Sequence, residues 1–136
     1  YAGPTRETAK RASENLLNRF GDSVDGVYTP TETSTSGMLL ALQDLGRAGR
    51  TQFVGFDASD ALVEAMRDGE IHGLVVQNPM RMGYLGVVTM VEHLQGNAVE
   101  PRIDTGVTVI TPENLDDPES QALVDPPVEQ YLETAR

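Results

Sequence analysis

Short apolar runs alternate with amphipathic segments along most of the chain. Such runs, when they are bounded by polar residues and turns, are typical of strands buried in a parallel sheet. We expect strands at residues 24–28, 52–56, 73–76 and 105–110. Apolar residues recur at helical spacing elsewhere, so we expect helices at residues 5–20, 34–45, 59–68 and 80–95. This alternation predicts an α/β fold with a parallel sheet and right-handed crossovers.

Residue types at the segment ends refine the helix boundaries. Three pairs of a capping residue and a proline predict helix starts: Asn78-Pro79, Thr111-Pro112 and Asp117-Pro118. Asp57 or Ser59 is expected to cap the third helix, which ends at Gly69. In the first helix, the expected buried face consists of four apolar residues: Ala9, Ala12, Leu16 and Phe20.

Polar side chains close two of the apolar runs. Asp57 follows the run that ends at Phe56, and Gln77 follows the run that ends at Val76. Ligands of open α/β sheets bind outside the carboxyl ends of the strands, so this pair predicts a small-molecule site. The alternatives are that Asp57 is only a helix cap and that Gln77 is only a polar strand end.

Composition excludes several classes of partner. The formal net charge of −11 disfavours nucleic acid and anionic lipid, because both attract basic surfaces. No apolar run approaches the roughly 20 residues of a membrane span. The chain has no cysteine, which excludes disulfides and thiol chemistry. It begins at Tyr1 without a methionine or a signal-peptide pattern, so we expect a fragment or a processed product.

Enzymatic constellations are not evident in the sequence. His72 and His93 are separated from each other and from acidic clusters, so neither suggests a metal site. No Gly-x-Ser-x-Gly elbow and no phosphate-binding loop occurs. We therefore expect no catalysis and no cofactor, although a doubly wound enzyme is a rival interpretation.

Four segments in one order resemble the C-terminal half of the ribose-type periplasmic binding proteins of sugar ABC transporters. They are residues 24–42, Phe53-Val-Gly-Phe-Asp57, Val76-Gln-Asn-Pro79 with Met82-Gly83, and residues 104–114. The resemblance implies a periplasmic-binding-protein type I fold, in which two lobes with three-layer parallel sheets are joined by three crossings. The lactose-repressor type of transcription regulator shares this fold and is the alternative.

The resemblance also implies a division of the chain. Residues 1–76 would be the later part of the C-terminal lobe, and residues 77–103 would form a hinge crossing and a helix of the N-terminal lobe. Residues 104–112 would return as a strand to the C-terminal lobe. Residues 113–136 form an acidic tail, which we expect to wrap the surface or to be partly mobile.

Roles for individual residues follow from the resemblance. Asp57 would accept hydrogen bonds from two sugar hydroxyls, and Gln77 would bind a hydroxyl at the hinge. Many relatives have asparagine where this chain has Thr31, so that contact is altered or is supplied by Glu32 or Thr33. The alternative is that this loop only caps the next helix. The implied partners are a monosaccharide, a membrane permease and a chemoreceptor, and the implied location is the periplasm or the outer side of the cytoplasmic membrane.

Overall fold

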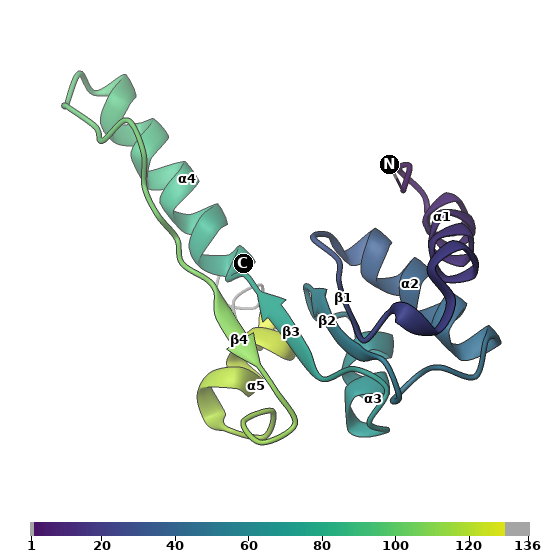
Figure 1. Ribbon diagram of the computed structural model, residues 1–136. Coiled ribbons are helices and arrows are strands. Elements are labelled where there is room, and N and C mark those ends of the chain that lie inside the picture. Colours follow the sequence, from purple (N-terminus) through teal and green to yellow (C-terminus); the bar gives the residue numbers. More distant parts are fainter. Residues whose placement is uncertain (1, 130–136) are drawn as a thin grey trace.

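A four-stranded, mostly parallel sheet forms the centre of the protein in the computed structural model, which describes residues 2–129 (Figure 1). The strands lie in the order β1 (Gly26–Tyr28), β2 (Gln52–Phe56), β3 (Gly73–Val76) and β4 (Thr108–Ile110). β1, β2 and β3 are parallel, as expected, whereas β4 runs antiparallel to β3. The α/β class is confirmed, with one reversed strand.

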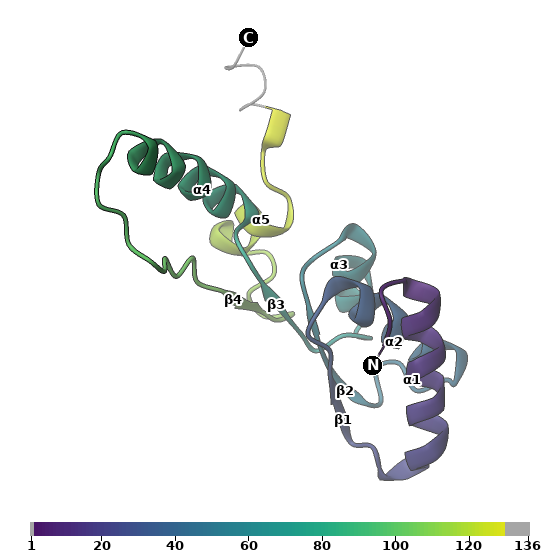
Figure 2. The ribbon, with the colours of Figure 1, turned by 90° about the horizontal axis from the view of Figure 1, so that it is seen from above.

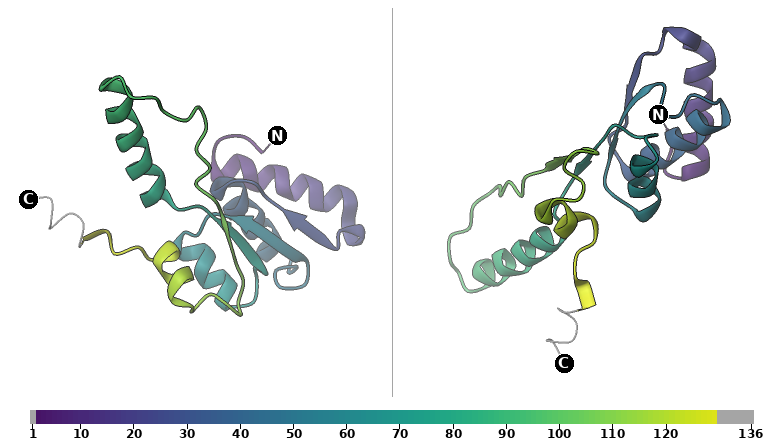
Figure 3. Two further views of the ribbon diagram at one scale, coloured as in Figure 1. Left: turned by 90° about the vertical axis from the view of Figure 1, so that its left-hand side faces the viewer. Right: turned by 90° about the horizontal axis from the view of Figure 1, so that it is seen from below.

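The reversal of β4 follows from the path of the chain between β3 and β4. After β3 the chain enters α4 (Pro79–Leu94), which points away from the sheet, and residues 95–107 run back beside it (Figure 3). The chain therefore re-enters the sheet at the end from which it left, so the next strand must run in the opposite direction. The strand begins at Thr108 and not at the expected residue 105.

The other helices are α1 (Arg6–Phe20), α2 (Glu32–Asp44), α3 (Asp60–Arg67) and α5 (Pro118–Val124). A single 3₁₀ turn at Gly21–Ser23 follows α1. α2 begins before the expected residue 34 because Thr31 accepts a hydrogen bond from the Ser34 N–H and forms a capping box. Pro118 occupies the first turn of α5, which confirms the helical turn expected there.

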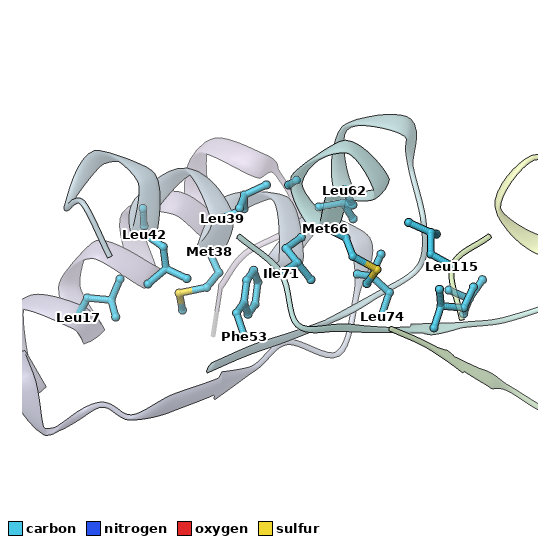
Figure 4. Packing of buried hydrophobic residues seen from close by; sticks show 14 residues of the cluster. Leu17, Met38, Leu39, Leu42, Phe53, Leu62, Met66, Ile71, Leu74 and Leu115 are labelled. Atoms are coloured by element: carbon cyan, nitrogen blue, oxygen red, sulfur yellow. The ribbon is translucent and has the colours of Figure 1, made fainter. Parts of the chain in front are cut away.

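One face of the sheet carries the hydrophobic core. Seen from above, α1, α2 and α3 lie on the same side of β1 and β2 (Figure 2). Fully buried side chains from the sheet and these helices meet there, including Phe53, Leu42, Leu62, Met66, Ile71 and Leu74 (Figure 4). Leu115 from the tail is also buried, so the start of the tail belongs to the core.

The opposite face of the sheet is largely open among the described residues. Tyr28 is 56% exposed and Val109 is 54% exposed, and both point to this side by strand alternation. The expected three-layer arrangement is therefore represented within residues 2–129 by the sheet and one layer of helices. The rest of the acidic tail, residues 130–136, lies outside the described residues.

The buried face of α1 differs from the one expected. Ala9, Ser13 and Leu17 are buried, whereas Leu16 and Phe20 are each 51% exposed. Ser13 can lie in the interface because its hydroxyl donates to the Ala9 carbonyl at 2.8 Å, which satisfies the polar group within the helix. The pattern of hydrophobic residues therefore predicted a stripe of α1 that lies next to the one actually buried.

Apolar side chains cover α4 on several sides, yet none of its residues is buried. Tyr84, Val87 and Leu94 are 69%, 66% and 76% exposed. Helices that are apolar all round are normally enclosed by other elements. Within residues 2–129, no helix is both long enough and apolar enough to cross a bilayer.

Candidate functional site

Asp57 and Gln77 line the same pocket at the carboxyl ends of β2 and β3. The cavity is about 450 Å³ in volume, and its wall consists of Asp57, Ala58, Val76, Gln77, Pro79, Met82 and Leu123. β2 and β3 are adjacent and parallel, so the residues that follow them emerge side by side. The structure thus brings together the two polar residues that the sequence pattern singled out.

The backbone presents Asp57 in an unusual conformation. Its φ is 63°, and it is the non-glycine residue with positive φ among residues 2–129. Its N–H donates to the Val75 carbonyl on β3 at 2.9 Å, which anchors the turn to the neighbouring strand. Ser59, and not Asp57, occupies the N-cap position of α3, and its side chain makes no capping hydrogen bond. Capping of α3 therefore does not explain why an aspartate occupies position 57.

The electrostatic environment of Asp57 makes its carboxyl a weaker acid than an exposed aspartate. Partial burial raises the pKa of the Asp57 carboxyl, and the negative charge of Glu32 raises it further. Within the described residues, no side-chain or backbone donor forms a hydrogen bond with this carboxylate that could offset the cost. The carboxylate is available to accept hydrogen bonds from an outside donor.

Gln77 offers complementary hydrogen-bonding groups on the other side of the cavity. It is half-buried, and its amide makes no hydrogen bond to another residue within 2–129. The next residue, Asn78, is engaged in capping, because its Oδ1 accepts from the Arg81 N–H at 2.9 Å. A glutamine amide both donates and accepts, whereas a carboxylate only accepts, so the pair suits a ligand with several hydroxyl groups.

The loop residues Thr31, Glu32 and Thr33 do not line this pocket. Thr31 caps α2 through its hydroxyl, as the alternative interpretation of this loop held. Glu32 accepts a hydrogen bond from the Ser36 hydroxyl at 2.9 Å and lies 3.7 Å from Arg6. Thr33 is half-buried. Ligand contacts by these three residues remain a prediction.

Sequence reasoning missed part of the pocket wall. Leu123 of α5 contributes to it, although the sequence predicted only acidic residues and a helix start in this part of the chain. The available signal was the apolar Leu123-Val124 pair one helical turn and more after Pro118. Met82 of α4, which is 40% exposed, also lines the cavity. Among residues 2–129, no cluster of three or more acidic or histidine side chains could hold a metal ion.

The fold is that of periplasmic binding proteins. The family model described as a periplasmic binding protein domain matches residues 1–98, and the chain belongs to this family. The ribose import binding protein of Haemophilus influenzae is 32% identical over 106 residues, which are 78% of this chain and 35% of that protein.

Solved structures show the same similarity. An ABC transporter solute-binding protein from Agrobacterium vitis with bound D-fucose has a TM-score of 0.85 and is 34% identical, over 91% of this chain and 42% of that one. A carbohydrate transporter solute-binding protein from Agrobacterium radiobacter in complex with D-arabinose has a TM-score of 0.85 at 30% identity, over 92% and 42%. The chain therefore spans less than half the length of these relatives.

Proposed function

We propose that this chain is the C-terminal portion of the solute-binding component of a sugar ABC importer, and that it helps to capture a monosaccharide. The observation that carries the proposal is the shared cavity of Asp57 and Gln77 at adjacent strand ends. Its support is the similarity of the chain to transporter proteins solved with D-fucose and D-arabinose.

In this proposal the chemistry is recognition without bond making. Asp57 accepts hydrogen bonds from two sugar hydroxyls, and Gln77 donates to one hydroxyl and accepts from another. Each hydrogen bond to a charged group contributes roughly 1.5–3 kcal/mol, and micromolar affinity needs about 8 kcal/mol. The two bonds of Asp57 together contribute roughly 3–6 kcal/mol, so further contacts are needed. In this proposal they come from Gln77 and from a second lobe.

The two-lobe division is part of the same proposal. Residues 1–76 and 104–112 belong to the C-terminal lobe, and residues 77–103 cross into the N-terminal lobe. The exposed apolar surface of α4 supports this division, because a helix of this kind requires enclosure by other elements. A sugar that contacts both lobes binds the closed arrangement better than the open one and so favours closure. A membrane permease then recognises the closed form outside the cytoplasmic membrane.

Titration calorimetry on the complete two-lobe protein with a panel of monosaccharides tests the proposal. We expect micromolar binding of at least one sugar and loss of that binding in Asp57→Ala. An unchanged affinity in this variant would remove Asp57 from the site. Binding of an operator DNA by the complete protein would favour the repressor alternative, and turnover of a sugar phosphate or ester would favour an enzyme.

A further inference from the structure

A buried hydroxyl contacts the end of β2, one residue before Asp57. Thr35, in the first turns of α2, is fully buried. Its Oγ1 lies 2.8 Å from the Thr31 carbonyl, 2.9 Å from the Phe56 N–H nitrogen and 2.9 Å from the Thr29 hydroxyl. The Phe56 carbonyl is more distant at 3.3 Å. Three chain segments thus meet at one oxygen atom.

The single proton of this hydroxyl fixes the directions of the bonds. Thr35 donates it to the Thr31 carbonyl, at the shortest of the four distances. It therefore accepts from the Phe56 N–H, and the Thr29 hydroxyl donates to it. All hydrogen-bonding capacity of a threonine hydroxyl is used, and a buried hydroxyl of this kind is costly to remove alone.

The Thr35 hydroxyl continues the sheet where β1 ends. The Thr29 N–H still donates to the Val54 carbonyl at 3.1 Å, which is the last backbone bond between these strands. The next donor of β2, the Phe56 N–H, bonds to the Thr35 side chain. β2 is therefore held on this edge up to the residue immediately before Asp57. On the other edge the Asp57 N–H bonds to Val75.

The hydrogen bonds on the two edges of β2 help to hold Asp57 at its positive φ. A non-glycine residue in the left-handed region is strained and persists where the surrounding structure enforces it. Gly55 shows how closely Thr35 approaches β2, because a Cβ at that position would lie 2.2 Å from the Thr35 methyl carbon. Both faces of the Thr35 side chain, polar and apolar, contact the end of this strand.

We propose that Thr35 is the positioning residue of the site: its hydroxyl fixes the end of β2, so that the Asp57 carboxylate faces the cavity. The inference rests on the proposed function for its effect on affinity. Thr35 does not line the pocket, so it acts through Asp57 and not by touching the sugar.

The test compares Thr35→Val, which removes the hydroxyl at constant shape, with Thr35→Ser, which keeps it, in the complete protein. Two quantities are measured: monosaccharide affinity by calorimetry, and the Asp57 amide and carboxyl resonances by NMR over a pH titration. We expect Thr35→Val to bind at least tenfold more weakly with a displaced Asp57 amide resonance and an altered carboxyl titration. The monosaccharide affinity of Thr35→Ser is expected to remain within about twofold of the wild-type affinity.

A matched control separates positioning from general destabilisation. Ser13→Ala removes another buried hydroxyl bond, on α1, and is expected to leave both Asp57 readouts unchanged. If Thr35→Val does not fold, Thr29→Ala weakens the same network and should change both readouts in the same direction, and unchanged readouts would overturn the inference.

The two readouts keep the two proposals apart. If the wild-type protein binds no monosaccharide, the proposed function fails, and the NMR comparison still decides whether Thr35 positions Asp57. Unaltered Asp57 resonances in folded Thr35→Val would overturn the positioning role, whatever the affinity.

Discussion

Ala9 of α1 packs directly against Gly37 of α2. A Cβ at position 37 would lie 2.6 Å from the Ala9 Cβ and 2.7 Å from the backbone nitrogen of Lys10. The two helices therefore approach each other closely enough for the backbone of one to contact the other. This close approach explains why α1 buries the stripe of Ala9, Ser13 and Leu17.

Gly37→Ala is expected to destabilise the protein by about 1–3 kcal/mol, because the obstructing atoms belong to backbone and to a rigid methyl group. Urea unfolding followed by circular dichroism measures the loss. Gly86→Ala in the same 136-residue chain is the matched control, since Gly86 lies in α4 with open space around it there, and we expect stability to rise by roughly 0.4–1 kcal/mol. Equal effects of the two substitutions would contradict this account of the α1–α2 contact.

Asp57→Asn is expected to stabilise the fold and to weaken sugar binding about tenfold or more. Asparagine tolerates the left-handed backbone, carries no charge next to Glu32 and avoids the burial cost that raises the pKa of Asp57. It loses one acceptor, which costs a charged hydrogen bond of roughly 1.5–3 kcal/mol. Thermal unfolding and calorimetry on the same preparations measure the two effects, and a less stable variant would contradict the electrostatic argument.

The stability gain of Asp57→Asn should depend on pH. The folded state binds a proton more readily than the unfolded state at Asp57, because the folded pKa is the higher one. Wild-type stability therefore falls as pH rises through the window from the unfolded to the folded pKa. The difference in stability between Asp57→Asn and the wild type should reach its maximum above this pH window and should vanish below it. A series of melting curves in acidic buffers can follow this change.

Arg47 joins two carbonyl groups in the segment between α1 and β1. Its guanidinium donates to the Gly21 carbonyl at 2.7 Å and to the Val24 carbonyl at 2.9 Å. Arg47→Lys keeps the charge but cannot span both acceptors, so we expect a loss of about 1.5–3 kcal/mol in chemical denaturation. The exposed Arg50 is the control, and Arg50→Lys should change stability by less than about 0.5 kcal/mol.

The exposed surface of α4 provides a test of the two-lobe proposal. Val87→Lys and Leu94→Lys should each change the stability of the 136-residue chain by less than about 0.5 kcal/mol, since both side chains are mostly exposed in it. In the complete protein the same substitutions should cost more than about 2 kcal/mol, because a lysine would replace an apolar residue at an enclosed surface. Similar values in the two proteins would remove this support for the division.

Sequence patterns predicted the helices, the three parallel strands and the convergence of Asp57 with Gln77, because these follow from periodicity and from the geometry of parallel strand ends. They did not predict the direction of β4, since strand alternation carries no information on how a chain returns to a sheet. Thr35 was missed for a related reason. A threonine within a helix gives no sequence signal of burial. Thr35 can bond to the Phe56 N–H only because β1 ends before β2 does, which the sequence does not reveal.

Val76 and Thr108 are direct partners in the antiparallel pairing of β3 with β4. The segment that leads out to α4 and the segment that leads back are thus fastened together where they join the sheet (Figure 1). The two adjacent segments are the place about which α4 and residues 95–107 could rotate as a unit. Such a rotation would displace Leu94 far more than the core residues Phe53 and Leu74, because no residue of α4 belongs to the core.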